Sequence, residues 1–385
     1  MADPKRSNSV VTTAGDLNAT RVSPALFTLS DITAHLVWPR LLRAPRMAFS
    51  PHRIGLVLVG LAIVGLLDSV GGAILSRGQL GGPLSNIARE FLAGLDRLIL
   101  AARSLDAGAA GRELVAIFTK SGLGLIQKPG GGLDWGAFTL LVLLVPLAVS
   151  VLGVVGCAVS RSVAMEFALA RHARWTEHLS FALARWKAVA GAIILPLVAA
   201  WVLCLVLAML GGLLKVGVLG VIAAALLPVA FVIAGACVLV FCGVLGGSLM
   251  IPACVACDDA DAFDAVSRTY AFVYAQPLRL ILYVIISTIA ALGGVFVVGM
   301  LVSGILALIE RCTGVPVGSS NVPESVSQLG ANAQAITRFW AGVLTLGVAS
   351  YALASAFAAG TLVYLALRRT VDGQDEEQLA LAGAN

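Results

Sequence analysis

Six stretches of this chain are each long and apolar enough to cross a lipid bilayer as an α-helix. A helix needs about 20 apolar residues to cross roughly 30 Å of hydrocarbon. The stretches cover residues 54–76, 136–160, 189–212, 219–250, 280–308 and 340–366. Charged residues make up 12% of the chain, whereas a typical soluble protein has about 25%. So few charges cannot cover a water-soluble globule, and the sequence therefore predicts an all-α, polytopic transmembrane helix bundle of about six spans within residues 54–370.

The fourth apolar stretch is longer than one span requires. Residues 216–253 contain no charged side chain. Two interpretations are open: Pro228 kinks one long helix, or residues 216–227 form a separate short interfacial piece before the span.

Lysine and arginine residues predict the orientation of the bundle. Sixteen of the 26 basic residues fall in the segments that are cytoplasmic if the N-terminus is cytoplasmic, and ten fall in the opposite segments. The first set of segments is 1–53, 161–187, 251–279 and 367–385, and the second is 77–134, 213–218 and 309–339. Because cytoplasmic loops carry the excess of basic residues, both termini are predicted to be cytoplasmic.

The segment before the first span has a regular pattern of basic residues. Residues 24–53 are predicted to form a cytoplasmic amphipathic helix, in which Arg40, Arg43 and Arg46 recur every three residues. Such a helix suits the surface of an inner leaflet rich in anionic lipid, at about 1 kcal/mol per basic residue. The alternative is that these arginines only flank a span, as the positive-inside rule requires.

Further extramembrane helices are predicted between the spans. Residues 161–187 and 258–276 read as cytoplasmic interfacial amphipathic helices, and residues 77–134 as an external, largely helical loop. In that loop one apolar face recurs at helical spacing, made of Leu84, Ile87, Phe91, Leu95, Leu98 and Ala102. The polar residues 1–23 and the acidic tail 371–385 are predicted to be disordered.

Four aspartates stand within seven residues after the fourth span. They are Asp258, Asp259, Asp261 and Asp264, and Arg268 follows one helical turn after the last of them. We expect Asp264 and Arg268 to pair on the polar face of a helix, and the other aspartates to lie at its N-cap and first turn. The alternative is a divalent-metal or acid–base site, but the spacing of a calcium loop is absent from this stretch.

Asp68 interrupts the first apolar stretch. An ionisable group inside hydrocarbon is a functional candidate, because its charge costs about 3 kcal/mol or more at the bilayer centre. Asp68 could then couple proton or substrate movement. Since Gly71 and Gly72 follow closely, the alternative is that the span ends near Leu67 and leaves Asp68 at the outer interface.

Other sequence motifs give little evidence of a catalytic or metal-binding site. The C-x-x-C at Cys254 and Cys257 has no second pair and no histidine at zinc spacing, so both cysteines are interpreted as small apolar residues. The sequence has no phosphate-binding loop and no nucleophile elbow. We therefore predict no cofactor, no bound metal, no enzymatic activity and no nucleic-acid partner.

Residues 249–280 carry a short motif in which an apolar span ends in a proline, an acidic turn follows, and an Ala-x-x-Arg/Ser helix precedes the next span. The matching residues are Pro252, Asp258, Asp261, Ala265, Ser267 and Arg268. The motif resembles one in uncharacterised bacterial multi-pass proteins, among them the membrane domain associated with glycerophosphodiester phosphodiesterases. The resemblance extends over residues 161–300 at most. It implies a location in the bacterial cytoplasmic (inner) membrane, but no phosphodiesterase activity, because the α/β catalytic domain is missing.

Three functions are compatible with these features. The leading one is a structural or accessory membrane component that packs with anionic lipids, with partner membrane proteins or with a second copy of itself, because small residues recur every four positions in several spans. The alternative is a transporter or permease for a lipid-like or small substrate, with Asp68 and the break at Pro228 as its features. A third is a lipid-modifying enzyme that uses the aspartates between Asp258 and Asp264.

Overall fold

The computed structural model describes residues 38–75, 82–126, 135–171, 173–215, 217–313 and 331–372. Every regular element in these ranges is a helix. The N-terminal 37 residues and the tail from residue 373 lie outside the described residues, and so do the predictions made for them.

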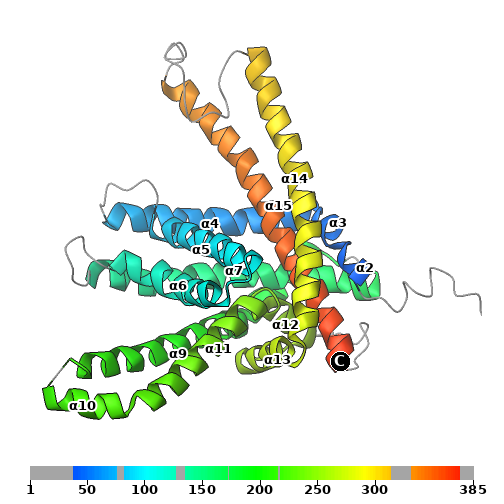
Figure 1. Ribbon diagram of the computed structural model, residues 1–385. Helices are drawn as coiled ribbons and strands as arrows, with labels where there is room; N and C mark the ends of the chain where they lie inside the picture. Colours follow the sequence, from blue (N-terminus) through cyan, green and yellow to red (C-terminus); the bar gives the residue numbers. More distant parts are fainter. Residues whose placement is uncertain are drawn as a thin grey trace, which may run out of the picture. The chain divides into compact units, whose positions relative to one another are not determined.

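Six helices of the described chain are long and apolar enough to cross a membrane. They are α4 (Pro51–Leu75), α7 (Trp135–Leu169), α9 (Trp186–Leu213), α11 (Leu227–Gly247), α14 (Pro277–Thr313) and α15 (Ala331–Val371) (Figure 1). Large apolar side chains on these helices, such as Phe231 and Phe296, remain exposed. Lipid can cover such surfaces, whereas water cannot do so without a large cost in free energy. The predicted all-α bundle of six spans is confirmed.

The long fourth stretch consists of two helices. A short helix, α10 (Gly217–Ala225), is separated from the span α11 by one residue, Leu226. Pro228 occupies the first turn of α11, where its missing N–H costs nothing, because the first amides of a helix have no acceptor within the helix. Of the two interpretations, the structure therefore favours a separate short helix over a kink.

The basic segment before the first span is not one helix. Its described part holds two short helices, α2 (Trp38–Leu41) and α3 (Ala44–Ala48). A proline stands at the first or second position of α2, α3 and α4. The prolines of α3 and α4 each stand where a new helix starts, because a proline cannot continue the preceding helix. The hydroxyl of Tyr351 donates a hydrogen bond of 3.1 Å to the carbonyl of Pro45, which attaches α3 to α15.

The predicted external loop contains a helical hairpin, α5 (Pro83–Arg103) and α6 (Ala107–Ile126). Its helices pack closely because Gly94 leaves no side chain in the way: a Cβ at this position would lie 2.6 Å from the side chain of Ile117. Phe118 of α6 stacks on Phe241 of α11 with ring centroids 4.2 Å apart. The hairpin is thus packed against a span.

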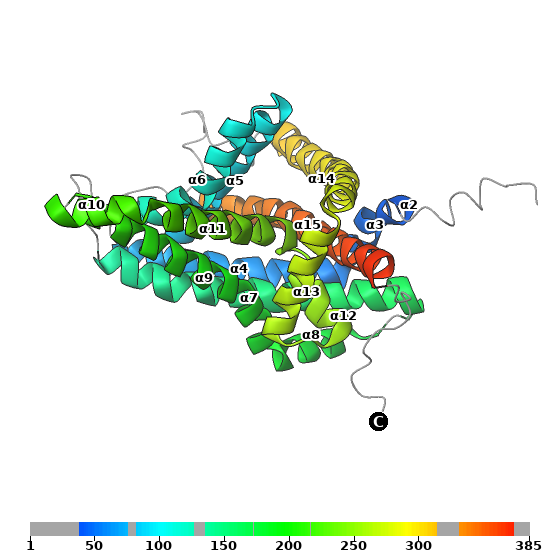
Figure 2. The ribbon, with the colours of Figure 1, turned by 60° about the horizontal axis from the view of Figure 1, so that its bottom comes forward.

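The predicted inner helices are shorter than expected and are joined by a third one. The first corresponds to the end of α7 and to α8 (Trp175–Ala184), and the second to α13 (Ala262–Ala275). Between α11 and α13 lies α12 (Ile251–Asp258), which is buried at seven of its eight positions. It contacts α7, α9, α13 and α15, and Figure 2 shows α8, α12 and α13 together at one end of the bundle.

Small residues let the helices approach one another around α12. A Cβ at Gly360 of α15 would lie 2.4 Å from the backbone oxygen of Leu249, and a Cβ at Gly243 would overlap the ring of Tyr270. Close backbone approach at small residues is the usual mode of helix packing in lipid. The recurring small residues of α11 and α15 therefore serve packing within the chain.

Candidate functional site

The acidic stretch divides between two helices. Asp258 is the last residue of α12, and Asp259 follows in the left-handed conformation with φ 54°. Asp259 thereby turns the chain, a conformation that aspartate tolerates better than most residues. Asp261 occupies the N-cap position of α13, without a side-chain cap hydrogen bond, and Asp264 lies in the first turn. The expectation that all of these aspartates begin one helix is therefore wrong for Asp258 and Asp259, which end the preceding helix.

Asp258 is the centre of a buried polar cluster. Its carboxylate lies 3.0 Å from Nη1 of Arg268 and 3.2 Å from Nη1 of Arg368, and the hydroxyl of Tyr364 donates a hydrogen bond to it. The side chain of Asp258 is 6% exposed, that of Arg368 7% and that of Arg268 42%. We call these four residues the Asp258 cluster. It joins α12 to α13 and to the last turns of α15.

Arg268 therefore pairs with Asp258 and not, as predicted, with Asp264. The physical reason is burial: a charge pair gains more from Coulomb attraction where little water surrounds it. Asp264 is exposed on the surface of α13, where an ion pair contributes little.

The position of Asp258 explains why it needs two arginines. A carboxylate at the C-terminal end of a helix faces the negative end of the helix dipole, and a buried carboxylate also loses its hydration. Arg268, Arg368 and the hydroxyl of Tyr364 together offset both costs. The arrangement has the chemistry of a structural ion-pair network.

Two further arginines attach α12 to neighbouring helices. Arg185, between α8 and α9, forms an ion pair with Asp259. Nη1 of Arg161, on α7, donates a hydrogen bond of 2.9 Å to the carbonyl of Ala256, and its guanidinium lies 3.7 Å from the ring centroid of Phe181 on α8. Each of these contacts satisfies a polar group at the end of α12.

A second buried polar group connects the first two spans. Nε of Arg53, on α4, donates a hydrogen bond of 2.9 Å to the hydroxyl of Ser162 on α7. Arg53 also forms an ion pair with Glu166 and donates to the carbonyl of Met47. The side chain of Arg53 is 2% exposed, so these contacts replace its hydration.

His178 of α8 is buried next to these arginines. It is 2% exposed, and its Nδ1 has no hydrogen-bond partner. Burial, together with the positive charges of Arg161 and Arg53, lowers the pKa of His178 from 6.5 to about 4. The imidazole is therefore neutral near pH 7, where its charge would be opposed by its surroundings.

The C-x-x-C of α12 is packed in the interior. Burial raises the pKa of the Cys254 thiol to about 12 and raises that of Cys257 well above its usual value. Sγ of Cys254 also lies 3.3 Å from the hydroxyl oxygen of Tyr364. Because the thiolate is the reactive form of cysteine, both residues are expected to behave as inert, apolar groups.

Asp68 binds the start of the helix α5. Its Oδ1 accepts hydrogen bonds from the backbone N–H of Leu84 at 2.7 Å and of Ser85 at 3.2 Å. These amides belong to the first turn of α5, whose N-cap residue is Gly82. Asp68 of α4 therefore caps α5 from a distance of 16 residues in sequence, and its charge complements the positive end of the α5 dipole.

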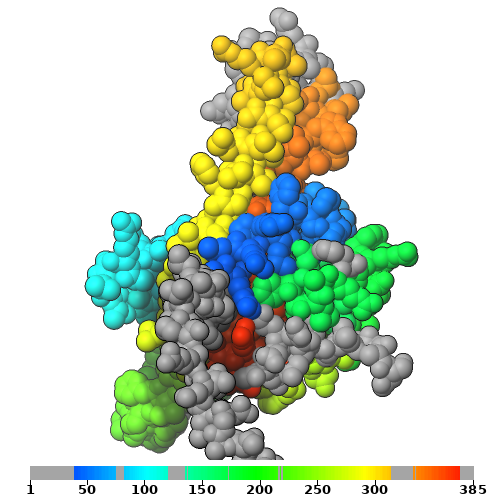
Figure 3. All heavy atoms as spheres, turned by 90° about the vertical axis from the view of Figure 1, so that its right-hand side faces the viewer, coloured from blue at the N-terminus to red at the C-terminus, as the bar shows by residue number. Residues whose placement is uncertain are grey.

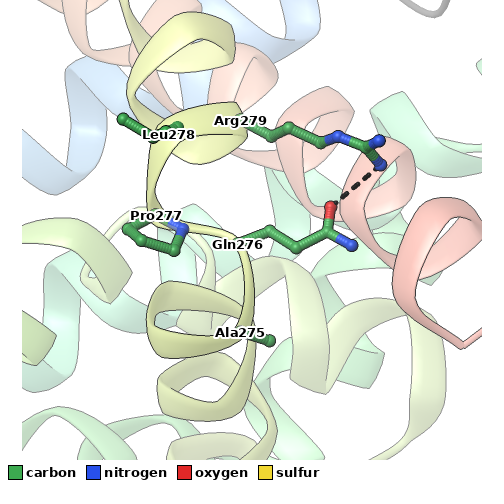
Figure 4. Close-up of a pocket in the computed structure, with 5 residues that line it drawn as sticks. All are labelled: Ala275, Gln276, Pro277, Leu278 and Arg279. Atoms are coloured by element: carbon green, nitrogen blue, oxygen red, sulfur yellow. Dashed lines mark hydrogen bonds between the residues drawn. The ribbon is translucent and has the colours of Figure 1, made fainter.

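The remaining candidates lie apart from these clusters. Arg43 and Arg46 are exposed at α3, and Arg40 of α2 is partly buried. Among the described residues, no three histidine, cysteine, aspartate or glutamate side chains converge as metal ligands. A shallow hollow lies at the junction of α13 and α14 (Figure 4), where Arg279 donates a hydrogen bond of 3.1 Å to the side chain of Gln276.

None of the three partners of Asp258 was predicted from the sequence, since Arg268 was expected to pair with Asp264. Tyr364 lies inside an apolar run, and Arg368 stands at the end of that run, where a basic residue is expected to flank a span. The signal that could have found them is the buried carboxylate itself, because such a group needs a cation from another helix.

The fold and these clusters define a class: a multi-pass, all-helical membrane protein with buried ion-pair networks between its helices. No protein-family model, curated protein sequence or solved structure matches this chain. The resemblance at residues 249–280 stays a prediction. The structure places its Arg268 on the carboxylate of its Asp258.

Proposed function

We propose that this chain is a non-enzymatic, structural or accessory component of its membrane, which packs with lipids and with partner membrane proteins. One observation carries the proposal: the acidic side chains best suited to chemistry are engaged in joining helices. Asp258 is held by two arginines and a tyrosine, and Asp68 by the amides of α5. A carboxylate occupied in this way is poorly placed to take up a metal ion or a substrate proton.

The membrane in this proposal is the bacterial cytoplasmic membrane, with both termini in the cytoplasm. In addition to the basic-residue counts, the clustering of arginines near α12 supports this orientation. Four segments bring arginines to α12 or to the turn that follows it: Arg161, Arg185, Arg268 and Arg368. Because segments rich in arginine and lysine stay on the cytoplasmic side during membrane insertion, this end of the bundle would face the cytoplasm.

The proposed lipid partners are anionic. Arg43 and Arg46 are exposed on α3, which packs against α14 and α15. Basic groups held beside a span can contact the phosphates of an inner leaflet, at about 1 kcal/mol for each residue.

Purification in a mild detergent tests this function. We expect the protein to elute with retained anionic phospholipid and with a partner protein or a second copy, as measured by native mass spectrometry. The double variant Arg43→Gln/Arg46→Gln should retain less anionic lipid, whereas the control Arg311→Gln/Arg338→Gln, at the opposite ends of α14 and α15, should not. A monomer free of both lipid and partner protein would contradict the proposal.

Transport of a lipid-like or small substrate is the competing function. If Asp68 only caps α5, Asp68→Asn should leave any uptake by reconstituted vesicles unchanged, because the amide oxygen can still accept the two hydrogen bonds. Substrate uptake that requires the Asp68 carboxylate, in a variant that inserts and elutes normally, would favour a transporter.

A further inference from the structure

Two cysteine thiols meet between the spans α9 and α11. Sγ of Cys204 lies 3.5 Å from Sγ of Cys237, a separation at which no other atom can lie between the two sulfur atoms. Both residues are free cysteines in the structure. They are 33 positions apart in the chain, so they meet because the two spans pack together, and not because of a local motif such as C-x-x-C.

The surroundings of the two thiols are apolar. Cys237 is 4% exposed and belongs to a buried cluster with Phe241, against which Phe118 of the α5–α6 hairpin packs. In Figure 3 the cyan residues of that hairpin stand at the surface of the molecule. Cys204 is only partly buried, and the next residue of α9, Leu205, is 61% exposed. Cys204 is therefore the thiol that a reagent dissolved in the membrane reaches first.

The cysteine pair lies in the half of α9 that is distant from α12. Cys204 follows Trp186, the first residue of α9, by about five helical turns, or roughly 27 Å along the axis. In the proposed orientation this half of the bundle is nearer the outer face of the cytoplasmic membrane, where thiols are not kept reduced as they are in the cytosol. The contact between the two sulfur atoms does not depend on that orientation.

We propose that Cys204 and Cys237 form a disulfide that joins α9 to α11, with a lipid hydroperoxide as the oxidant. The sulfur of Cys204 attacks the peroxide, the O–O bond breaks, Cys204 becomes a sulfenic acid, and its proton leaves with the lipid alcohol. The sulfur of Cys237 then displaces the sulfenic hydroxyl, which leaves as water with the proton of Cys237, and the S–S bond forms. Both sulfur atoms are oxidised and the peroxide oxygens are reduced.

The bond closes a loop over residues 204–237, which contains α10. It fixes α9 against α11, and with them the cluster on which Phe118 of the hairpin is seated. The second step is intramolecular because the two sulfur atoms are already in contact, which favours the disulfide over further oxidation of the sulfenic acid. This inference goes beyond the proposed function, since it assigns a modification site that packing with lipids or partners does not require.

Treatment with a lipid-soluble peroxide tests the inference. A Cys312→Ser protein, which lacks the exposed thiol, is reconstituted in vesicles of phosphatidylcholine and phosphatidylglycerol and treated with cumene hydroperoxide. The remaining thiols are then blocked with N-ethylmaleimide in denaturant, and the chain is cleaved with trypsin. The peptide 188–215 contains Cys204 as its one cysteine, and the peptide 216–268 contains Cys237. Mass spectrometry of the joined peptides identifies which cysteines are bonded.

The matched control is Cys204→Ala/Leu205→Cys, which moves the thiol by one residue to an exposed position of α9. Such a shift rotates the side chain by about 100° around the helix, away from Cys237. We expect at least about tenfold more bond to Cys237 from the native pair than from this control, because only the native pair is in contact. Two free thiols after treatment, a bond to Cys242 instead of Cys237, or equal amounts in the control would each overturn the inference.

A second measurement distinguishes a bond that fits the fold from one that distorts it. The oxidised protein should melt roughly 4 °C higher than the reduced protein by circular dichroism in detergent, because a cross-link restricts the unfolded chain. Dithiothreitol should abolish the difference, and Cys237→Ser should show none. A lower Tm after oxidation would show that the bond distorts the packing of α9 on α11 and would also overturn the inference. Neither result affects the lipid and partner retention measured for the proposed function, so the two proposals can fail separately.

Discussion

Replacement of Asp258 by alanine should destabilise the protein much more than the same change at the neighbouring aspartates. Asp258 is 6% exposed and pairs with Arg368, which is 7% exposed. Removal of one partner from a buried ion pair costs about 3–5 kcal/mol, because the other charge stays buried without compensation. The lower end of this range applies, since the second partner, Arg268, is 42% exposed and partly screened by water.

The matched controls are Asp261→Ala and Asp264→Ala. Both aspartates are exposed on the same short stretch, and substitutions at such positions change stability by about 0.5 kcal/mol or less. The same comparison separates the burial of Asp258 from any general effect of removing negative charge near α13.

Thermal unfolding in detergent measures the difference. A dye that fluoresces on reaction with thiols reports unfolding, because Cys157, Cys254 and Cys257 are buried in the folded state. A Cys312→Ser background removes the exposed thiol. For a loss of about 3 kcal/mol from a chain of this length we expect a fall in Tm of roughly 4 °C for Asp258→Ala. The double variant Asp258→Ala/Arg368→Met should lose less than the sum of its single changes, because the partners are coupled.

The reasoning is refuted if Asp258→Ala melts within about 1 °C of Asp264→Ala, a difference that corresponds to less than about 1 kcal/mol. In that case the Asp258 cluster would not hold α12, and the acidic stretch would need another explanation.

Three other substitutions test the packing and the buried polar groups. The pKa of His178 is about 4 in the folded protein and 6.5 in the unfolded chain, so protonation of the unfolded chain lowers the free energy of unfolding as the pH falls from 6.5 toward 4. At pH 5 this loss is about 2 kcal/mol, and His178→Phe should therefore reduce the drop in Tm between pH 7.5 and pH 5. Gly82→Ala should destabilise the start of α5 by about 1–3 kcal/mol, because its Cβ would lie 2.1 Å from the backbone oxygen of Asp68; proteolysis of the hairpin in detergent measures this, and unchanged cleavage would count against the cap. Gly360→Ala should lower Tm, whereas Gly347→Ala on the same helix, with no atom within 4 Å of its Cβ, should not; equal Tm values would show that close approach at position 360 is unimportant.

The spans could be predicted because each depends on local composition. A run of apolar residues of sufficient length has no alternative in a bilayer, since every backbone group must find its hydrogen bond within the helix. The separate helix α10 was one of two interpretations, and Pro228 at the start of α11 decided between them. The helix breaks at Pro45 and Pro51 are not predicted by the regular spacing of the arginines, because that spacing is compatible with one continuous helix.

The ion pairs could not be predicted, because their partners are far apart in the chain. Arg268 lies four residues from Asp264 and ten from Asp258, and the sequence favours the nearer carboxylate. Only the burial of Asp258 beside Arg368, 110 residues later, reverses that preference. Asp68 is a similar case: a carboxylate in an apolar run indicates transport, until the first turn of α5 is found at its oxygen.

The sequence by itself was sufficient to predict that lipid surrounds most of this protein and that it has six spans, because apolar length and charge content are properties of each segment alone. Tertiary structure decided what the polar residues do. The burial of α12, the two arginines on Asp258 and the cap that Asp68 gives α5 all depend on which helices meet. Free energies of charge and burial are set by those neighbours, and not by position along the chain.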